Sequence, residues 1–252
     1  MKIVVCVKQV PDTAARVTVI NGQVSWGDSP LVINPWDEYA VEAALAQNGD
    51  VTALTLGEAG NNEALKTALA MGCNEAVIVS DPALADADSQ AAARVLAAAI
   101  QKIGGVELVV FGRQAVDGDG GVTAAQTARA LGWPVLSLAA SVAAGDGKIK
   151  VERAVEEGRQ IVEGRLPAVI SVTKDIGEPR YPSFMGIRKA SRAVIPAWTL
   201  ADLGMSAPAP TISWPEVMNP PSREVVAEFI GGGDPKEIAA ALAEKILAEK
   251  VI

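Results

Sequence analysis

Short apolar runs alternate with amphipathic segments along the first two thirds of the chain. The expected strands are Ile3–Val7, Val51–Leu56, Ala76–Val79, Leu108–Phe111, Val135–Leu138 and Ala168–Thr173. The expected helices are Glu38–Gln47, Glu63–Met71, Ser89–Lys102 and Thr123–Leu131. Strands that are apolar throughout are buried on both faces. The pattern therefore predicts an α/β fold with a doubly wound, mostly parallel sheet over residues 1–175.

Two segments have the pattern of β-hairpins added to that sheet. Val17–Trp26 contains Asn21-Gly22, a dipeptide that adopts the positive φ angles of a tight turn. Lys148–Val155 and Gln160–Arg165 form the second candidate pair and lead into the last expected strand. We expect both hairpins as additions to the α/β core.

The chain changes character after residue 175. Residues 176–221 hold eight of the fifteen prolines, which interrupt helices and strand ladders, so we expect an extended arm. Residues 178–192 combine basic and apolar side chains in an acidic protein. Asp234–Lys250 has the capping and periodicity of an amphipathic helix. Residues 176–252 are therefore expected to form a second part, an arm followed by a helix.

Composition removes several kinds of chemistry. The chain has 252 residues, 22 basic and 30 acidic, for a formal charge of −8. A negative surface repels phosphate backbones, so we do not expect nucleic-acid binding. Histidine is absent and cysteine occurs twice, at Cys6 and Cys73. This excludes catalytic triads that need histidine, disulfide frameworks and cysteine-rich zinc sites, and we expect neither catalytic residues nor metal ligands.

The N-terminal apolar run has five residues, too few for a secretion signal, and no small-residue cleavage site follows it. No apolar stretch reaches the ~18 residues that a membrane-spanning helix needs. We therefore expect a cytoplasmic protein that is not embedded in a membrane.

We expect three loops at the edge where parallel sheets bind ligands, at the carboxyl ends of their strands. They are residues 8–13, 34–38 and 112–123. The third loop holds four glycines and precedes a helix, so its backbone N–H groups and the helix dipole favour a phosphate. Arg113 adds a charge and Thr123 adds a hydroxyl donor. It matches neither the Walker A loop nor the dinucleotide fingerprint, and an acidic turn or a cation site at Asp117 and Asp119 stays open.

These features also have plainer interpretations. Asn34-Pro35 suits the start of a helix, and Trp36 suits packing or an interface. Cys6 suits a buried strand, as a small core residue. The basic segment could be a solvated loop, although Phe184 among cations indicates a docking surface.

At these loops the chain resembles the β subunit of electron transfer flavoprotein, over nearly its whole length. The matching motifs, in order, are VKQVPD at 7–12, NPWDEYAVEAA at 34–44, ALAMG at 68–72, GRQAVDGD at 112–119, LPAV at 166–169 and EPRY at 178–181. The resemblance implies a fold like that of adenine nucleotide hydrolases. It also implies a heterodimer whose α subunit holds most of an FAD, while the β subunit shelters that flavin, binds AMP and wraps the α subunit with its C-terminal part.

The resemblance also implies site residues. The AMP positions of the family match Cys6, Asn34, Pro35, Trp36, Asp37, Leu56, Gly112, Arg113, Gln114, Ala115, Val116, Asp117, Gly118, Asp119, Gly120, Gly121, Val122 and Thr123. Thr13 and Trp36 match positions near the FAD ring. The segment that docks on partner dehydrogenases matches Phe184, Met185, Ile187, Arg188, Lys189 and Arg192.

The sequence departs from the family at three points. Gly121-Val122 precede Thr123 where the family often has Asn-Gln, so a phosphate would depend more on backbone N–H groups. Phe184 stands where leucine is common. Ala190-Ser191 interrupt a run that is denser in lysine elsewhere.

The resemblance implies a carrier between flavoprotein dehydrogenases, such as acyl-CoA dehydrogenases of fatty acid oxidation, and a membrane quinone oxidoreductase. One alternative is the electron-bifurcating form, whose β site binds a second FAD and accepts hydride from NADH. Gly118 favours that form, whereas Asp86-Ala87-Asp88-Ser89 departs from its expected Gly-x-Asp-Thr. A distant alternative is an ATP-using adenylating enzyme, whose glycine-rich first loop is missing at residues 8–13. The long arm disfavours a nucleotide-binding module that acts alone.

Overall fold

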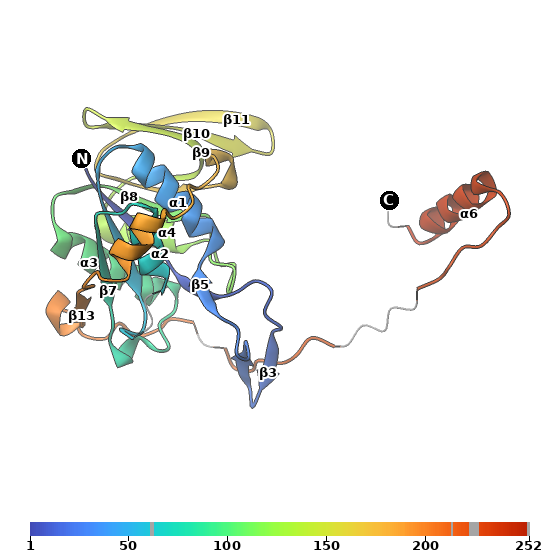
Figure 1. Cartoon of the computed structure of the whole chain (residues 1–252), viewed down its shortest axis with the longest axis horizontal. Helices are drawn as coiled ribbons and strands as arrows, with labels where there is room; N and C mark the ends of the chain where they lie inside the picture. Colours follow the sequence, from blue (N-terminus) through green and yellow to red (C-terminus); the bar gives the residue numbers. More distant parts are fainter. Residues whose placement is uncertain (61–62, 213, 222–226, 251–252) are drawn as a thin grey trace. The chain divides into compact units, whose positions relative to one another are not determined.

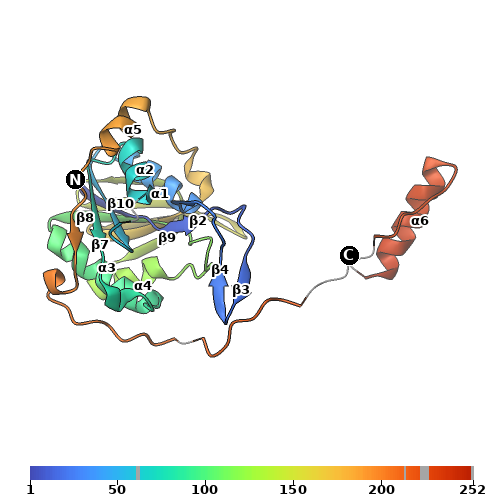
Figure 2. The same ribbon diagram turned by 60° about the horizontal axis from the view of Figure 1, so that its bottom comes forward.

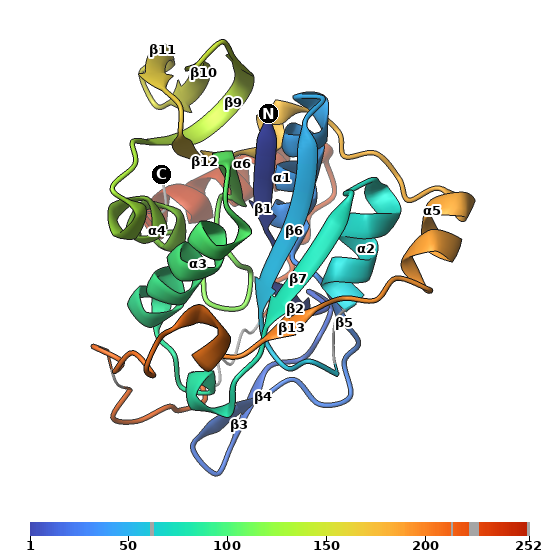
Figure 3. The ribbon, with the colours of Figure 1, turned by 90° about the vertical axis from the view of Figure 1, so that its left-hand side faces the viewer.

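The computed structural model describes residues 1–60, 63–212, 214–221 and 227–250. It divides into two compact units, Met1–Val217 and Met218–Ile252. The first unit is built on one large sheet with helices on both sides, seen from three directions in Figures 1, 2 and 3. The predicted α/β class is confirmed.

The described residues form a nine-stranded sheet in the order β11-β10-β9-β12-β8-β1-β6-β7-β13. Within the described part of this sheet, only the β9–β10 and β10–β11 pairs are antiparallel. The strands are β1 (Lys2–Cys6), β6 (Asp50–Leu56), β7 (Glu75–Val79), β8 (Val106–Gly112), β9 (Val135–Gly145), β10 (Lys148–Val155), β11 (Gly158–Arg165), β12 (Ala168–Val172) and β13 (Ala197–Trp198).

The order of strands reverses beside β1. The chain proceeds outward from β1 through β6 to β7, then returns to place β8 on the other side of β1. Parallel sheets bind ligands at such a switch point, beyond the carboxyl ends of the two strands. The two ends are the residues after Cys6 and Gly112, where the first and third loops begin.

Alternating side chains of the parallel strands fill two cores. Ile3 and Val5 point into one core, which α1 (Pro35–Ala46) and α2 (Glu63–Met71) cover. Val4 and Cys6 point into the other, under α3 (Ser89–Ile103) and α4 (Thr123–Leu131). Figure 3 shows the two helix layers on opposite sides of the sheet. The all-apolar strands predicted this double burial.

The two hairpins are also present. β3 (Thr18–Ile20) and β4 (Gln23–Ser25) pair across Asn21-Gly22, whose φ angles of 52° and 75° are both positive. β10 and β11 pair along their full length. A further small sheet joins β2 (Gln9–Pro11) to β5 (Leu31–Ile33).

The chain after residue 175 has more regular structure than an extended arm. It contains the short helix α5 (Phe184–Ala190) and β13, which pairs with β7 at the edge of the sheet. The Ser183 hydroxyl caps the start of α5 by accepting a hydrogen bond from Gly186 N–H. The proline content of this segment, on which the expected arm rests, gives no information about such a cap. Three-residue 3₁₀ turns occupy 82–84, 174–176 and 201–203.

The second unit contains α6 (Pro235–Ala248). Asp234 caps it by accepting a hydrogen bond from Lys236 N–H, and Pro235 occupies its first turn, as the sequence indicates. Across the described part of the chain, no helix has the length and apolar composition to cross a membrane.

Asp88 ties the end of the first unit to α3. One carboxylate oxygen accepts from Ala91 N–H at 2.7 Å and caps that helix. The other accepts from the N–H and hydroxyl of Thr211, at 2.6 and 2.7 Å, and from Ile212 N–H at 3.0 Å. These bonds hold the pKa of Asp88 well below its usual value, so its charge is present throughout the neutral range.

We expect Asp88→Ala to remove the helix cap and release residues 211–212 together. The melting temperature should fall by about 2–4 °C, and amide exchange at 211–212 should accelerate. Hydrogen–deuterium exchange and calorimetry measure both effects. Asp86→Ala, at an exposed neighbouring carboxylate, is the matched control. Unchanged exchange at 211–212 would show that Asp88 does not hold this segment.

Candidate functional site

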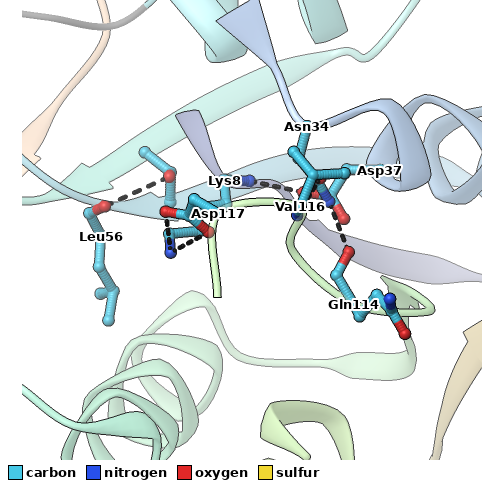
Figure 4. Close-up of polar contacts among 8 residues, drawn as sticks. Lys8, Asn34, Asp37, Leu56, Gln114, Val116 and Asp117 are labelled. Atoms are coloured by element: carbon cyan, nitrogen blue, oxygen red, sulfur yellow. Dashed lines mark hydrogen bonds and ion pairs between the residues drawn. The ribbon is translucent and has the colours of Figure 1, made fainter. Parts of the chain in front are cut away.

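The first three predicted loops meet at the switch point of the sheet. The loop at 112–123 joins β8 to α4, the loop at 8–13 leaves β1, and residues 34–38 begin α1. Figure 4 shows Lys8, Asn34 and Asp37 in contact with one another or with residues 114–117 of the third loop. Leu56, at the end of β6, borders the same edge.

Asn34 fastens the glycine-rich loop to α1. Its buried side-chain amide donates to the carbonyl oxygen of Gln114 at 2.8 Å and accepts from Val116 N–H at 3.1 Å. Its backbone N–H donates to the carbonyl of Lys8 at 2.8 Å. Asn34 occupies the capping position of α1, but its side chain makes no capping bond because the loop uses both of its polar ends.

Asp37 is buried directly beneath this junction. Its Oδ2 accepts from Lys8 N–H at 2.7 Å, which ties the exit of β1 to α1. Burial raises the pKa of the carboxyl to about 7, although hydrogen bonds from Lys8, Asn34 and Gly112 and the charge of Lys8 oppose the rise. The same burial, with the nearby Asp37 charge, raises the pKa of the Cys6 thiol well above its usual value.

Gly112 ends β8 where no side chain fits. A Cβ atom there would lie 2.7 Å from the carbonyl carbon and oxygen of Trp36, and closer still to Oδ1 of Asp37. These are backbone and buried atoms that cannot move aside cheaply. The glycine is therefore required so that β8 can approach the first turn of α1.

Lys8 pairs with the glycine-rich loop. Its ammonium lies 2.6 Å from Oδ2 of Asp117, and Asp119 accepts from the side-chain amide of Gln114 at 2.7 Å. Both carboxylates that suggested a cation site are thus engaged by side chains of this chain. The pairing of Lys8 with Asp117 could not be predicted, because the strand order that brings residue 8 to residue 117 is not local information.

The rest of the loop presents backbone and open space. Gly118 and Asp119 N–H groups turn back to the carbonyl of Ala115, at 3.2 and 2.8 Å. A Cβ on Gly118 or Gly120 would meet nothing within 4 Å, and Gly121 has a left-handed φ of 62°. Val122 is exposed, and Thr123 is the first residue of α4. The first N–H groups of that helix, which have no acceptor within the helix, therefore lie at the end of the loop. The described residues contain no grouping of three or more metal-binding side chains.

Thr13, predicted to lie near a flavin, is exposed in the loop after β2. Its neighbours line a shallow hollow of about 380 Å³, formed by Asp12, Ala14, Ala15, Arg16, Trp26, Ser29 and Pro30. Trp36 is half-buried, and the Arg113 guanidinium lies 5.6 Å from its ring centre. Trp26 and Arg16 were not predicted, since neither belongs to a motif.

The predicted docking residues are on another element, α5, which packs against α2. Phe184, Met185 and Ile187 are 79%, 69% and 53% exposed. Arg188 and Lys189 lie in the last turn, and Arg192 follows it, all exposed. The helix thus presents apolar and basic side chains together.

The pKa of Asp37 predicts a pH dependence of stability. Between pH 3.8 and about 7 the folded protein holds a proton that the unfolded chain releases. The free energy of unfolding should therefore fall as pH rises through this window, and then level off. Asp37→Asn keeps an acceptor but cannot titrate, so its stability relative to wild type should increase with pH. Urea unfolding across the window measures this, and a difference independent of pH would contradict it.

Comparison with known proteins agrees with this architecture. Residues 27–203 match the family model described as electron transfer flavoprotein domain. Over the full length of both chains, the protein is 35% identical to the caffeyl-CoA reductase-Etf complex subunit CarD of Acetobacterium woodii and 33% identical to the electron transfer flavoprotein subunit beta of Megasphaera elsdenii. It is 38% identical to the same subunit of Mycobacterium leprae, over 81% of this chain and 80% of that one.

The family match covers the loops at 34–38 and 112–123 and helix α5, and two relatives match from end to end. The chain therefore belongs to the electron transfer flavoprotein family, among the proteins named as its β subunit.

Proposed function

We propose that this chain is the noncatalytic half of a heterodimeric electron carrier. An α subunit would hold most of the FAD, flavoprotein dehydrogenases such as acyl-CoA dehydrogenases would reduce it, and a membrane quinone oxidoreductase would accept the electrons. The names of the relatives support this, because they include β subunits and a subunit of a reductase-Etf complex. A histidine-free chain suits a scaffold from which no acid–base step is required.

The main support for AMP binding is the glycine-rich loop at residues 112–123, which Asn34 holds in place. The phosphate would lie against backbone N–H groups around Gly121, the Thr123 hydroxyl and the N-terminal end of α4. The open space at Gly118 and Gly120 suits a ligand that backbone alone must approach. The adenosine would occupy the strand ends at Cys6 and Leu56.

The local charges suit an anion despite the acidic loop. Asp117 would repel a phosphate, but the Lys8 ammonium at 2.6 Å neutralises it. Asp119 is held by Gln114. Arg113 remains exposed at the start of the loop, 5.6 Å from the ring centre of Trp36, where its charge adds to the attraction.

The identity of the bound nucleotide tests this function. Denaturing the purified heterodimer should release one AMP and one FAD. The second candidate, a bifurcating carrier, is favoured by the Asp117-Gly118-Asp119 sequence and would release two FAD per heterodimer. Two flavins would overturn the AMP assignment.

Gly121→Asp should displace the nucleotide from this site. The new carboxylate brings a negative charge next to the phosphate, and its Cβ is strained at a φ of 62°. We expect nucleotide content to fall by about tenfold or more, while the FAD held mainly by the α subunit stays. Quantifying released nucleotides measures this; Gly145→Ala, in open space on β9, is the control. Full occupancy in the Gly121 variant would refute the cradle.

The same heterodimer gives α5 and the C-terminal part their roles. Thr13 and Trp36 would border the flavin, beside the hollow next to residues 12–16. Phe184, with Met185 and Ile187, would enter an apolar pocket on the dehydrogenase, while the basic residues attract its acidic surface. Residues 176–252 would contribute this docking segment and wrap the α subunit, in the cytoplasm.

Phe184→Ala should weaken docking without affecting flavin binding. Truncating an exposed aromatic anchor removes contact area that is buried only in the complex. The KM of the dehydrogenase for the heterodimer should therefore rise about tenfold or more. Steady-state transfer from an acyl-CoA dehydrogenase measures KM, and absorbance measures flavin content. Ile161→Ala, at an exposed apolar side chain of β11 to which no docking role is assigned, is the control. An unchanged KM would show that α5 is not the docking element.

A further inference from the structure

The helix α5 is too short to maintain its own conformation. It has seven residues, and isolated helices of that length are unstable in water. Its large apolar side chains do not anchor it either, since Phe184, Met185 and Ile187 are mostly exposed. Other residues must therefore order it.

The first anchor is an ion pair to α1. Arg180, just before α5, donates from Nε to Oε2 of Glu42 at 2.7 Å and from Nη2 to Oε1 at 2.9 Å. Its backbone N–H donates to the same Oε2 at 3.0 Å. Two parallel bonds fix the orientation of the guanidinium, and the third fixes the main chain. The Glu42 side chain is only 20% exposed, so water competes weakly for it.

The second anchor is a close approach of α5 to α2 at Gly186. A Cβ atom on Gly186 would lie 3.1 Å from the carbonyl carbon of Ala70, and closer still to its carbonyl oxygen. The φ of Gly186 is not left-handed, so space, and not backbone conformation, demands the glycine. The obstructing atoms belong to the backbone of a helix and cannot rotate away.

The C-terminal end of α5 is also held. Ala190 is 4% exposed and belongs to the core that α1 and α2 cover. Small and polar residues therefore bind the helix to the body, and the large apolar residues are left for a partner. A surface that is already ordered loses less conformational entropy when it binds.

We propose that Glu42 and Gly186 are positioning residues for partner docking: they hold α5 in the orientation that presents Phe184. The identity of the partner as a flavoprotein dehydrogenase rests on the proposed function. Neither residue needs to touch that partner, because each acts through the position of the helix.

The test uses the FAD-loaded heterodimer carrying Glu42→Gln or Gly186→Ala. Hydrogen–deuterium exchange should accelerate about fivefold at residues 181–191, because one anchor is lost. The KM of an acyl-CoA dehydrogenase for the heterodimer should rise about fivefold, because docking is impaired. The kcat should stay within about twofold of wild type, because electron transfer within the complex is not impaired. Combining Glu42→Gln with Arg180→Gln should add little to either single change, since both remove one pair.

Two control variants remove similar groups elsewhere. Glu63→Gln breaks an exposed ion pair with Lys66 on α2, and Gly145→Ala adds a methyl group in open space. Both should leave exchange and KM unchanged. Flavin content and circular dichroism verify that every variant is folded.

The outcomes separate this inference from the proposed function. Unchanged exchange at 181–191 would overturn the anchoring role, and faster exchange with an unchanged KM would overturn the role in docking. If Phe184→Ala raises KM in the same assay while the anchor variants do not, the docking function stands and this inference fails. If Phe184→Ala also leaves KM unchanged, the docking surface itself is wrong.

Discussion

The candidate site depends on how closely β8 approaches the start of α1. Gly112 lets the strand end against the first turn of that helix, and Asp37 and Asn34 then tie the helix to both neighbouring loops. One helical turn thereby fixes two loops, at Lys8 and at residues 114–116, that are more than a hundred residues apart in sequence. The hydrogen bonds of Asn34 determine the path of the glycine-rich loop. Gly118 and Gly120 therefore need not pack against other residues, and the space beside them stays open.

This arrangement requires buried polar groups at the end of an apolar sheet. Asn34 satisfies both ends of its amide within the protein, so its burial costs little. Asp37 is costlier, and its raised pKa is the sign of that cost. Lys8 contributes twice, through its main chain to Asp37 and through its ammonium to Asp117, which links the buried and exposed parts of the site.

Local patterns predicted most of the fold, and the failures have physical causes. The all-apolar strands and glycine stops predicted the doubly wound sheet, because each depends on nearby residues alone. β9 was predicted only to Leu138, since the alanine-rich continuation to Gly145 has low strand propensity and is ordered by pairing with β10. The helix α5 was not predicted, because the many prolines of this segment indicated an extended chain although Ser183 caps a short helix there.

The site was predicted less completely than the fold. Glycine content and strand ends indicated the loop at 112–123, and the family resemblance supplied the roles. The contacts of Lys8, Glu42 and Gly186 could not be predicted, because each depends on which elements the topology places together. Pairings between distant segments carry this information, and a single sequence does not display them.

The two margins of the sheet differ in a way that bears on aggregation. β13 is only two residues long, so its outer side offers few hydrogen-bonding groups to a foreign strand. β11 is longer, but Arg159, Glu163 and Arg165 place charges along it. Short and charged margins both discourage strand addition between molecules. The first unit should therefore resist edge-to-edge pairing of its sheet with that of another molecule at high protein concentration.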